Sequence, residues 1–253
     1  MESLNVFGVL RKGFELYKDN FSKLFKASLL YVLVQLISSI ISFFDGLFSI
    51  GVISFVNFFV SLASVYFGIR LLISITILAR DIVKSEESEF VSAYAEAKQY
   101  FWRYIGNTLL VSIPVIIPMY FAISLHRAQI PFMHTFPQYI VIAIVVGIIA
   151  SYLYFAPISV ALEPYLENRL RYSFMLVKGH LIKVFSILIL SSYVFNAPIY
   201  IFNYLAPTQI KSAYFVLVLN FMSNFIYLFS TPFTACVGAV LFYKLRELNN
   251  NKL

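Results

Sequence analysis

Charged residues are scarce in this chain. Asp, Glu, Lys and Arg make up 12% of its 253 residues, whereas 60% are hydrophobic. A soluble domain carries roughly 25% charged residues, so a chain with half that share cannot cover a water-facing surface. The mean hydropathy of +0.83 points the same way. The composition excludes an ordinary soluble domain and predicts an integral membrane protein.

Residues that commonly carry chemistry are also few. Cys236 is the single cysteine, so no internal disulfide can form. His126 and His134 lie in a predicted outer loop and His180 in a predicted cytoplasmic helix, and none has a Cys or carboxylate at metal-ligand spacing. The sequence has no phosphate-binding loop, no Ser-His-Asp order and no paired-carboxylate motif. We therefore expect no metal, no cofactor and no enzymatic activity.

Long apolar stretches account for most of the chain. They predict six membrane spans at roughly 27–44, 52–79, 107–124, 137–162, 186–205 and 214–243. Several exceed the roughly 20 residues that a bilayer requires, so they should tilt or protrude. Residues 1–26 hold five basic residues at helical spacing, and we therefore expect no cleavable signal peptide.

The segments between these spans differ in charge. Basic residues cluster before the first span, after the second and fourth, and at the C-terminus, whereas the opposite side holds only Arg127 and Lys211. By the positive-inside rule both termini are cytoplasmic, as expected of a multi-pass protein of the cell membrane. The net charge of +7 then reflects membrane topology, and no nucleic-acid partner is expected.

An internal repeat of 80 residues runs through the chain without a gap. The matching sets include Lys18, Lys98 and Lys178; Phe21, Phe101 and Leu181; and Lys23, Arg103 and Lys183. We interpret residues 1–253 as one membrane domain with repeats at roughly 5–80, 85–168 and 169–248. Each repeat contains two spans, so the three units should be parallel and related by an approximate threefold axis along the membrane normal.

Each repeat begins with a basic amphipathic segment, at 7–26, 89–105 and 169–185. In the first, Phe7, Leu10, Phe14 and Tyr17 recur at steps of three and four, which indicates an apolar helical stripe. Such a helix lies in the headgroup plane; the alternative is a helix packed on a cytoplasmic partner. The predicted fold is therefore all-α, with three parallel repeats of one interfacial helix and one two-span hairpin.

The second spans align where a small residue adjoins a proline. With small shifts from the 80-residue register, Gly68, Ala156 and Thr231 occupy equivalent positions, and the last two precede Pro157 and Pro232. This pattern favours close helix packing and a kink, with a gating hinge as the alternative.

Arg70 is the charge most deeply placed in a predicted span. It precedes Arg80 by ten residues and should lie roughly 15 Å deeper, near the bilayer midplane. Intramembrane charges are costly and are functional candidates by default. We predict a pair between Arg70 and Glu163 inside the bundle, with a substrate or headgroup contact as the alternative.

The 80-residue register of the repeat also places cations together at the predicted cytoplasmic face. This basic ring consists of Lys18, Lys23, Lys98, Arg103, Lys178 and Lys183. It is expected to set topology and attract anionic lipid headgroups, each charge contributing about 1 kcal/mol near the surface. A selective anion or phosphate site between the helices is the alternative.

Three stretches resemble a known family. They are FELYKDNF at 14–21, MLVKGH at 175–180 and LFYKLR at 241–246, the last preceded by Pro232-Phe233. Together they are similar to the membrane domain of glycerophosphoryl diester phosphodiesterases and related multi-pass proteins. In that family the domain often precedes a soluble catalytic barrel, which has no counterpart in these residues. The resemblance thus implies a membrane domain without phosphodiesterase activity.

The leading functional hypothesis is a non-enzymatic domain that interacts with lipid or supports a membrane complex. Its expected partners are membrane lipids, chiefly anionic headgroups, together with other membrane proteins. The alternative is a transporter or channel that passes a small or lipid-like solute through an axial cavity.

Overall fold

The computed structural model describes residues 4–48, 51–87, 89–127, 136–205 and 213–250, which leaves His134 and Lys211 outside it. Every regular element within these ranges is a helix. The helices are α1 (Val6–Asp19), α2 (Phe21–Phe48), α3 (Gly51–Lys84), α4 (Phe90–Arg127), α5 (Phe136–Leu153), α6 (Phe155–Leu162), α7 (Arg169–Val177), α8 (Leu181–Leu205) and α9 (Ala213–Asn250).

Six stretches of these helices are long and apolar enough to cross a membrane. They are Phe21–Ile41, Ser54–Lys84, Phe90–Pro118, Ile144–Leu162, Leu181–Pro198 and Val218–Asn250. Each overlaps one of the six spans predicted from the sequence. The all-helical, multi-pass class is therefore confirmed.

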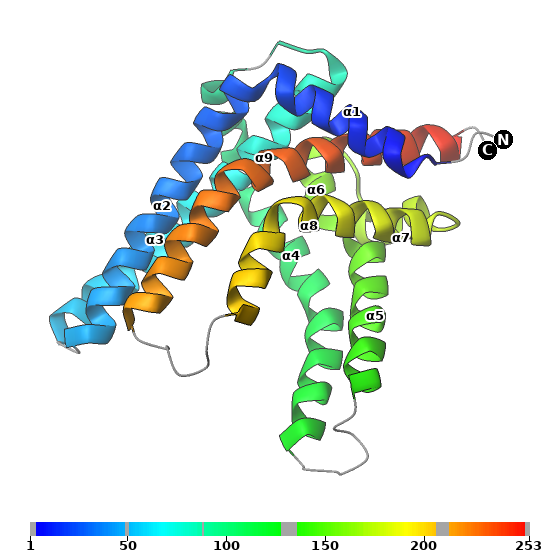
Figure 1. The fold of residues 1–253 in the computed structure, drawn as a ribbon. Helices are drawn as coiled ribbons and strands as arrows, with labels where there is room; N and C mark the ends of the chain where they lie inside the picture. The colour runs from blue at the N-terminus through cyan, green and yellow to red at the C-terminus, as the bar shows by residue number, and fades with distance from the viewer. Residues whose placement is uncertain (1–3, 49–50, 88, 128–135, 206–212, 251–253) are drawn as a thin grey trace.

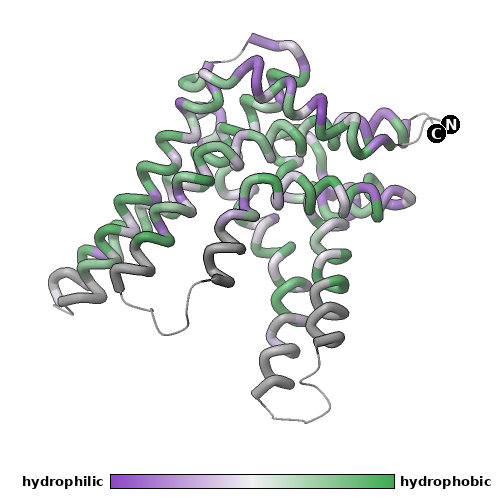
Figure 2. Tube along the Cα trace, viewed as in Figure 1, coloured by the Kyte–Doolittle hydropathy of each residue, from purple (hydrophilic) through white to green (hydrophobic). Residues whose placement is uncertain are grey.

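The long helices descend from a common upper layer (Figure 1). Helices α2 and α3 pack together and against α9, whereas α4 and α5 form a separate leg. Helix α1 lies across the top beside the second half of α9, and α7 lies near the upper ends of α5 and α6. Hydrophilic residues gather in this upper layer, which also contains both ends of the chain (Figure 2). The molecule thus has one polar end and one predominantly apolar end.

The buried core lies in the upper layer. The segments that form it are the second half of α3, the short helix α6 and the second half of α9. Ile75, Phe155 and Phe242 have no exposed surface, and the rings of Phe155 and Phe242 are 5.7 Å apart. Side chains such as Leu109 and Ile117 of α4 are instead more than half exposed, as expected for helices that face lipid.

The predicted interfacial segments differ from one another in structure. Segment 7–26 is divided at Asn20, whose side-chain amide donates to the Leu16 carbonyl, and segment 169–185 is divided at Gly179, which has a φ of 85°. Gly and Asn are frequent at helix ends because both adopt backbone conformations that most other residues disfavour. Segment 89–105 has Gln99 and Tyr100 at the equivalent places and continues into α4. In the second repeat the predicted interfacial helix therefore runs into its span without a break, and its position at the membrane surface stays a prediction.

A helix break in the fourth span adjoins Pro157. Helix α5 ends at Leu153 and α6 begins at Phe155, as expected because proline cannot donate a backbone hydrogen bond to the preceding turn. Ser173 of α7 bridges the break: its hydroxyl donates to the Tyr152 carbonyl at 2.6 Å and accepts from the Phe155 amide at 3.2 Å. The break thus leaves neither group without a partner.

Candidate functional site

Arg70 lies between α3 and α4 and contacts two tyrosines. One Nη atom donates to the Tyr94 carbonyl at 2.9 Å and the other to the Tyr66 hydroxyl at 3.4 Å. Its guanidinium carbon is also 4.0 Å from the centre of the Tyr94 ring. Aromatic faces attract cations, so Tyr94 stabilises this charge without a carboxylate. The Nε atom is buried and has no hydrogen-bond partner among the described residues.

The predicted pair between Arg70 and Glu163 is wrong. Glu163 follows the last residue of α6 with an extended backbone, and its carboxylate pairs with Arg246 of α9. The prediction assumed that both residues lie on continuous spans, whereas the fourth span is divided into α5 and α6 and its helix ends at Leu162, before Glu163. Arg246 lies 83 residues away, and no local pattern marks it as a partner.

A second polar cluster, which the sequence argument missed, is centred on Arg80 of α3. Both Nη atoms donate to the Glu96 carboxylate, at 2.8 and 3.1 Å, and Nε donates to Asp81 at 2.7 Å. Tyr100 also donates to Glu96, at 3.0 Å. The side chains of Arg80 and Asp81 are only 11% and 7% exposed. A sequence signal existed, because Arg80 and Asp81 directly follow the fully apolar end of a predicted span.

The same cluster closes the C-terminal end of α6. A helix leaves its last four carbonyl oxygens without partners in its own backbone. Arg80 donates to the Ala161 carbonyl at 3.0 Å, and the Tyr243 hydroxyl donates to the Leu162 carbonyl at 3.0 Å. All three guanidinium nitrogens of Arg80 are thus engaged. This geometry indicates a structural anchor joining α3, α4, α6 and α9.

The basic ring residues occupy the surface. Lys18, Lys23, Lys98, Arg103 and Lys178 are exposed, and Lys183 is partly buried. They belong to α1, α2, α4, α8 and the residue that follows α7. The ring cations therefore lie where solvent or headgroups reach them, and the described residues do not form one closed site. Arg169 is a separate, buried cation: burial lowers its pKa, and the nearby positive charge of Arg103 lowers it further.

In the described part of the chain, cavities adjoin the packed core. One of about 410 Å³ has polar residues of α1 and α9 in its wall. A second, of about 370 Å³, is apolar and bounded by α2, α3 and the first turns of α4, including Tyr94. A third, of about 620 Å³, lies between α1, α8 and α9. The first and third adjoin opposite flanks of α1.

Comparisons of the chain with protein-family models, with curated proteins and with solved structures give no match.

Proposed function

We propose that this protein is a non-enzymatic membrane domain that binds anionic lipid headgroups at its polar end. The packing of the upper layer carries this proposal. The second halves of α3 and α9 meet α6 through side chains without exposed surface, among them Ile75, Phe155 and Phe242. A solid centre suits a lipid-binding or scaffolding domain better than a conduit.

The alternative transporter would need a continuous polar cavity reaching Arg70. The cavity nearest to it is bounded by Tyr94 and by apolar residues such as Leu33 and Phe67. Arg70 itself is covered by Tyr94 at 4.0 Å. These observations favour lipid binding over axial transport.

The proposal includes three parallel repeats with both termini in the cytoplasm. Helices α2 and α8 begin at Phe21 and Leu181, two repeat lengths apart. Arg80 and Tyr243, which lie twelve residues after Gly68 and Thr231 respectively, both donate to the end of α6. Both features support the repeat, and the polar end in Figure 2 supports the orientation. The relation to the phosphodiesterase membrane domain stays a prediction.

Exposed cations supply the attraction. Each Lys or Arg close to an anionic surface contributes about 1 kcal/mol, and salt screens this interaction over about 10 Å at 0.1 M. Lys18 and Lys23 flank the junction of α1 and α2, while Lys98 and Arg103 lie on the first turns of α4. Together they would enrich anionic lipid around the polar end.

Lipid competition in nanodiscs tests this function. The protein is reconstituted in phosphatidylcholine with fluorescent phosphatidylglycerol or phosphatidylcholine as probe, and energy transfer from Trp102 reports proximity. We expect several-fold enrichment of phosphatidylglycerol that falls at 0.5 M salt. Replacing the six ring cations by Gln should reduce it. Equal recruitment of both lipids would overturn the proposal, as would solute flux through proteoliposomes without any lipid preference.

A further inference from the structure

Helix α1 rests on α9 along one narrow face. Val9, Gly13 and Tyr17 are buried in this contact. A Cβ atom on Gly13 would lie 2.6 Å from a methyl group of Val237, so only glycine permits this close approach. The two flanks of α1 beside this face are not covered by α9, and each borders a cavity.

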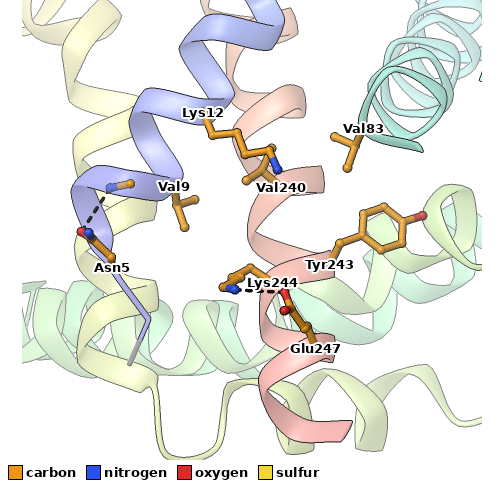
Figure 3. Close-up of a pocket in the computed structure, with 9 residues that line it drawn as sticks. Asn5, Val9, Lys12, Val83, Val240, Tyr243, Lys244 and Glu247 are labelled. Carbon is orange, nitrogen blue, oxygen red and sulfur yellow. Dashed lines mark hydrogen bonds and ion pairs between the residues drawn. The ribbon is translucent and has the colours of Figure 1, made fainter. Parts of the chain in front are cut away.

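The first flank borders the polar cavity of about 410 Å³. Its wall includes Lys12 from α1 and the pair Lys244 and Glu247 from α9, whose charged atoms are 3.0 Å apart. Figure 3 shows the Lys12 side chain extending over Val240 into this space. Lys12 has no hydrogen-bond or ion-pair partner among the described residues. The cavity therefore offers one cation without a partner, beside a second cation and a carboxylate.

The apolar part of this cavity consists of Val9, Val83 and Val240. The charged side chains that line the cavity are two lysines and one glutamate. This balance favours an anionic group, and the valines favour a ligand that is not wholly polar.

The second flank of α1 borders the cavity of about 620 Å³. Phe7, Leu10 and Phe14 of α1 face Val194 of α8 and Phe233 of α9 across it. Phe7 is 78% exposed and Phe14 is 51% exposed. Large apolar side chains exposed at the headgroup level are normally covered by acyl chains, because burial of apolar surface away from water is favourable.

The two cavities meet at the start of α1, because Asn5 and Gly8 line both. A single ligand can therefore contact both flanks by passing around the first turn of the helix. It must carry a negative charge at one end, for Lys12 and Lys244, and apolar chains at the other, for Phe7 and Phe14. Only an amphiphile combines these two properties.

We propose that one anionic phospholipid binds around the N-terminal turn of α1, with its phosphate in the polar cavity and its acyl chains in the apolar cavity. This site rests on the proposed function but differs from the basic ring in residues and in kind. The ring attracts a population of headgroups, whereas this site holds one molecule by both of its ends.

Native mass spectrometry of delipidated protein titrated with dioleoyl phosphatidylglycerol tests the site. We expect one lipid to bind more tightly than the rest. Each of Lys12→Gln and Lys244→Gln should weaken it about fivefold, the factor that corresponds to about 1 kcal/mol per lysine. Gly8 lines both cavities, so the larger side chain of Gly8→Leu should occupy part of the site and weaken binding. The new Cβ would approach only side-chain atoms of Asn5, so the helix itself should be preserved.

The matched controls are Lys26→Gln and Arg171→Gln, which remove exposed cations outside both cavities. Equal losses in the controls and the cavity variants would overturn the site while leaving the proposed function standing. Absence of any phosphatidylglycerol preference in the unmodified protein would refute the proposed function itself. Glycerol 3-phosphate should not compete at equal concentration. Full competition would refute the role of the apolar cavity.

Discussion

Replacing Arg80 by Met should cause a large loss of stability. The substitution preserves much of the side-chain volume but removes the donors that bind Glu96, Asp81 and the Ala161 carbonyl. Two carboxylates would then lie close together at the junction of α3 and α4 without their shared cation. The end of α6 would also lose one of its two capping donors.

The magnitude follows from the burial of the partners. Arg80 is 11% exposed, Asp81 7% and Glu96 31%. Breaking a pair this well buried costs about 3–5 kcal/mol, because the remaining charge stays desolvated. For a chain of this size each kcal/mol lowers the melting temperature by about 2–4 °C, so we expect a decrease of about 6–20 °C.

Thermal unfolding in a mild detergent, followed by circular dichroism, measures this decrease. The matched control is Arg11→Met, because Arg11 also pairs with a glutamate, Glu15, but their side chains are 82% and 54% exposed. An exposed pair contributes about 0–1 kcal/mol, so this control should change the melting temperature by less than about 4 °C.

A second variant tests the cause. Adding Glu96→Gln to Arg80→Met removes one of the two carboxylates left without a cation, and should restore part of the lost stability. If Arg80→Met melts within a few degrees of Arg11→Met, the cluster is not an anchor. If the double variant is as unstable as the sum of its two substitutions, charge burial is not the reason for the loss.

Three further perturbations have defined outcomes. Burial raises the pKa of Tyr17 to about 12 from its usual value near 10. The neutral form of Tyr17 therefore contributes stability below pH 10, and this contribution is lost as the pH rises towards 12. Between pH 10 and 12 the melting temperature of Tyr17→Phe should fall less than that of the unmodified protein, because Phe cannot ionise. Gly13→Leu should cost about 1–3 kcal/mol by forcing α1 away from Val237, seen as faster proteolysis of α1; unchanged proteolysis would contradict the close contact. Tyr243→Phe leaves the Leu162 carbonyl without its donor and should cost about 1–3 kcal/mol in thermal unfolding, whereas Tyr165→Phe, at a 94% exposed position, should cost nothing measurable.

The long apolar stretches of the sequence predicted the six candidate membrane spans well. Each of the six predicted spans lies within the observed helices, because a run of apolar residues long enough for a bilayer permits little else than a helix. A kink near Pro157 was predicted for a local reason as well, because proline interrupts the hydrogen bonds of a helix. The divisions at Asn20 and Gly179 were not predicted, since the 80-residue register carries the pattern of residues but not the local effect of these two residues.

The polar contacts were largely beyond prediction. Arg70 was identified as unusual, but its partners are a backbone carbonyl and an aromatic ring, which carry no charge for a sequence pattern to reveal. Glu163 and Arg246 are 83 residues apart on helices whose mutual orientation depends on the whole fold. The cavities beside α1 likewise depend on where α8 and α9 lie, which no single segment encodes.

The bridge across the break in the fourth span has a consequence for biosynthesis. The Tyr152 carbonyl and the Phe155 amide receive their partner from Ser173, which the ribosome adds 18 residues after Phe155. These two backbone groups of the fourth span therefore gain their partner only when α7 has been synthesised and has docked. Because α7 follows the fourth span in the chain, a fragment that ends before Ser173 would lack both of these hydrogen bonds.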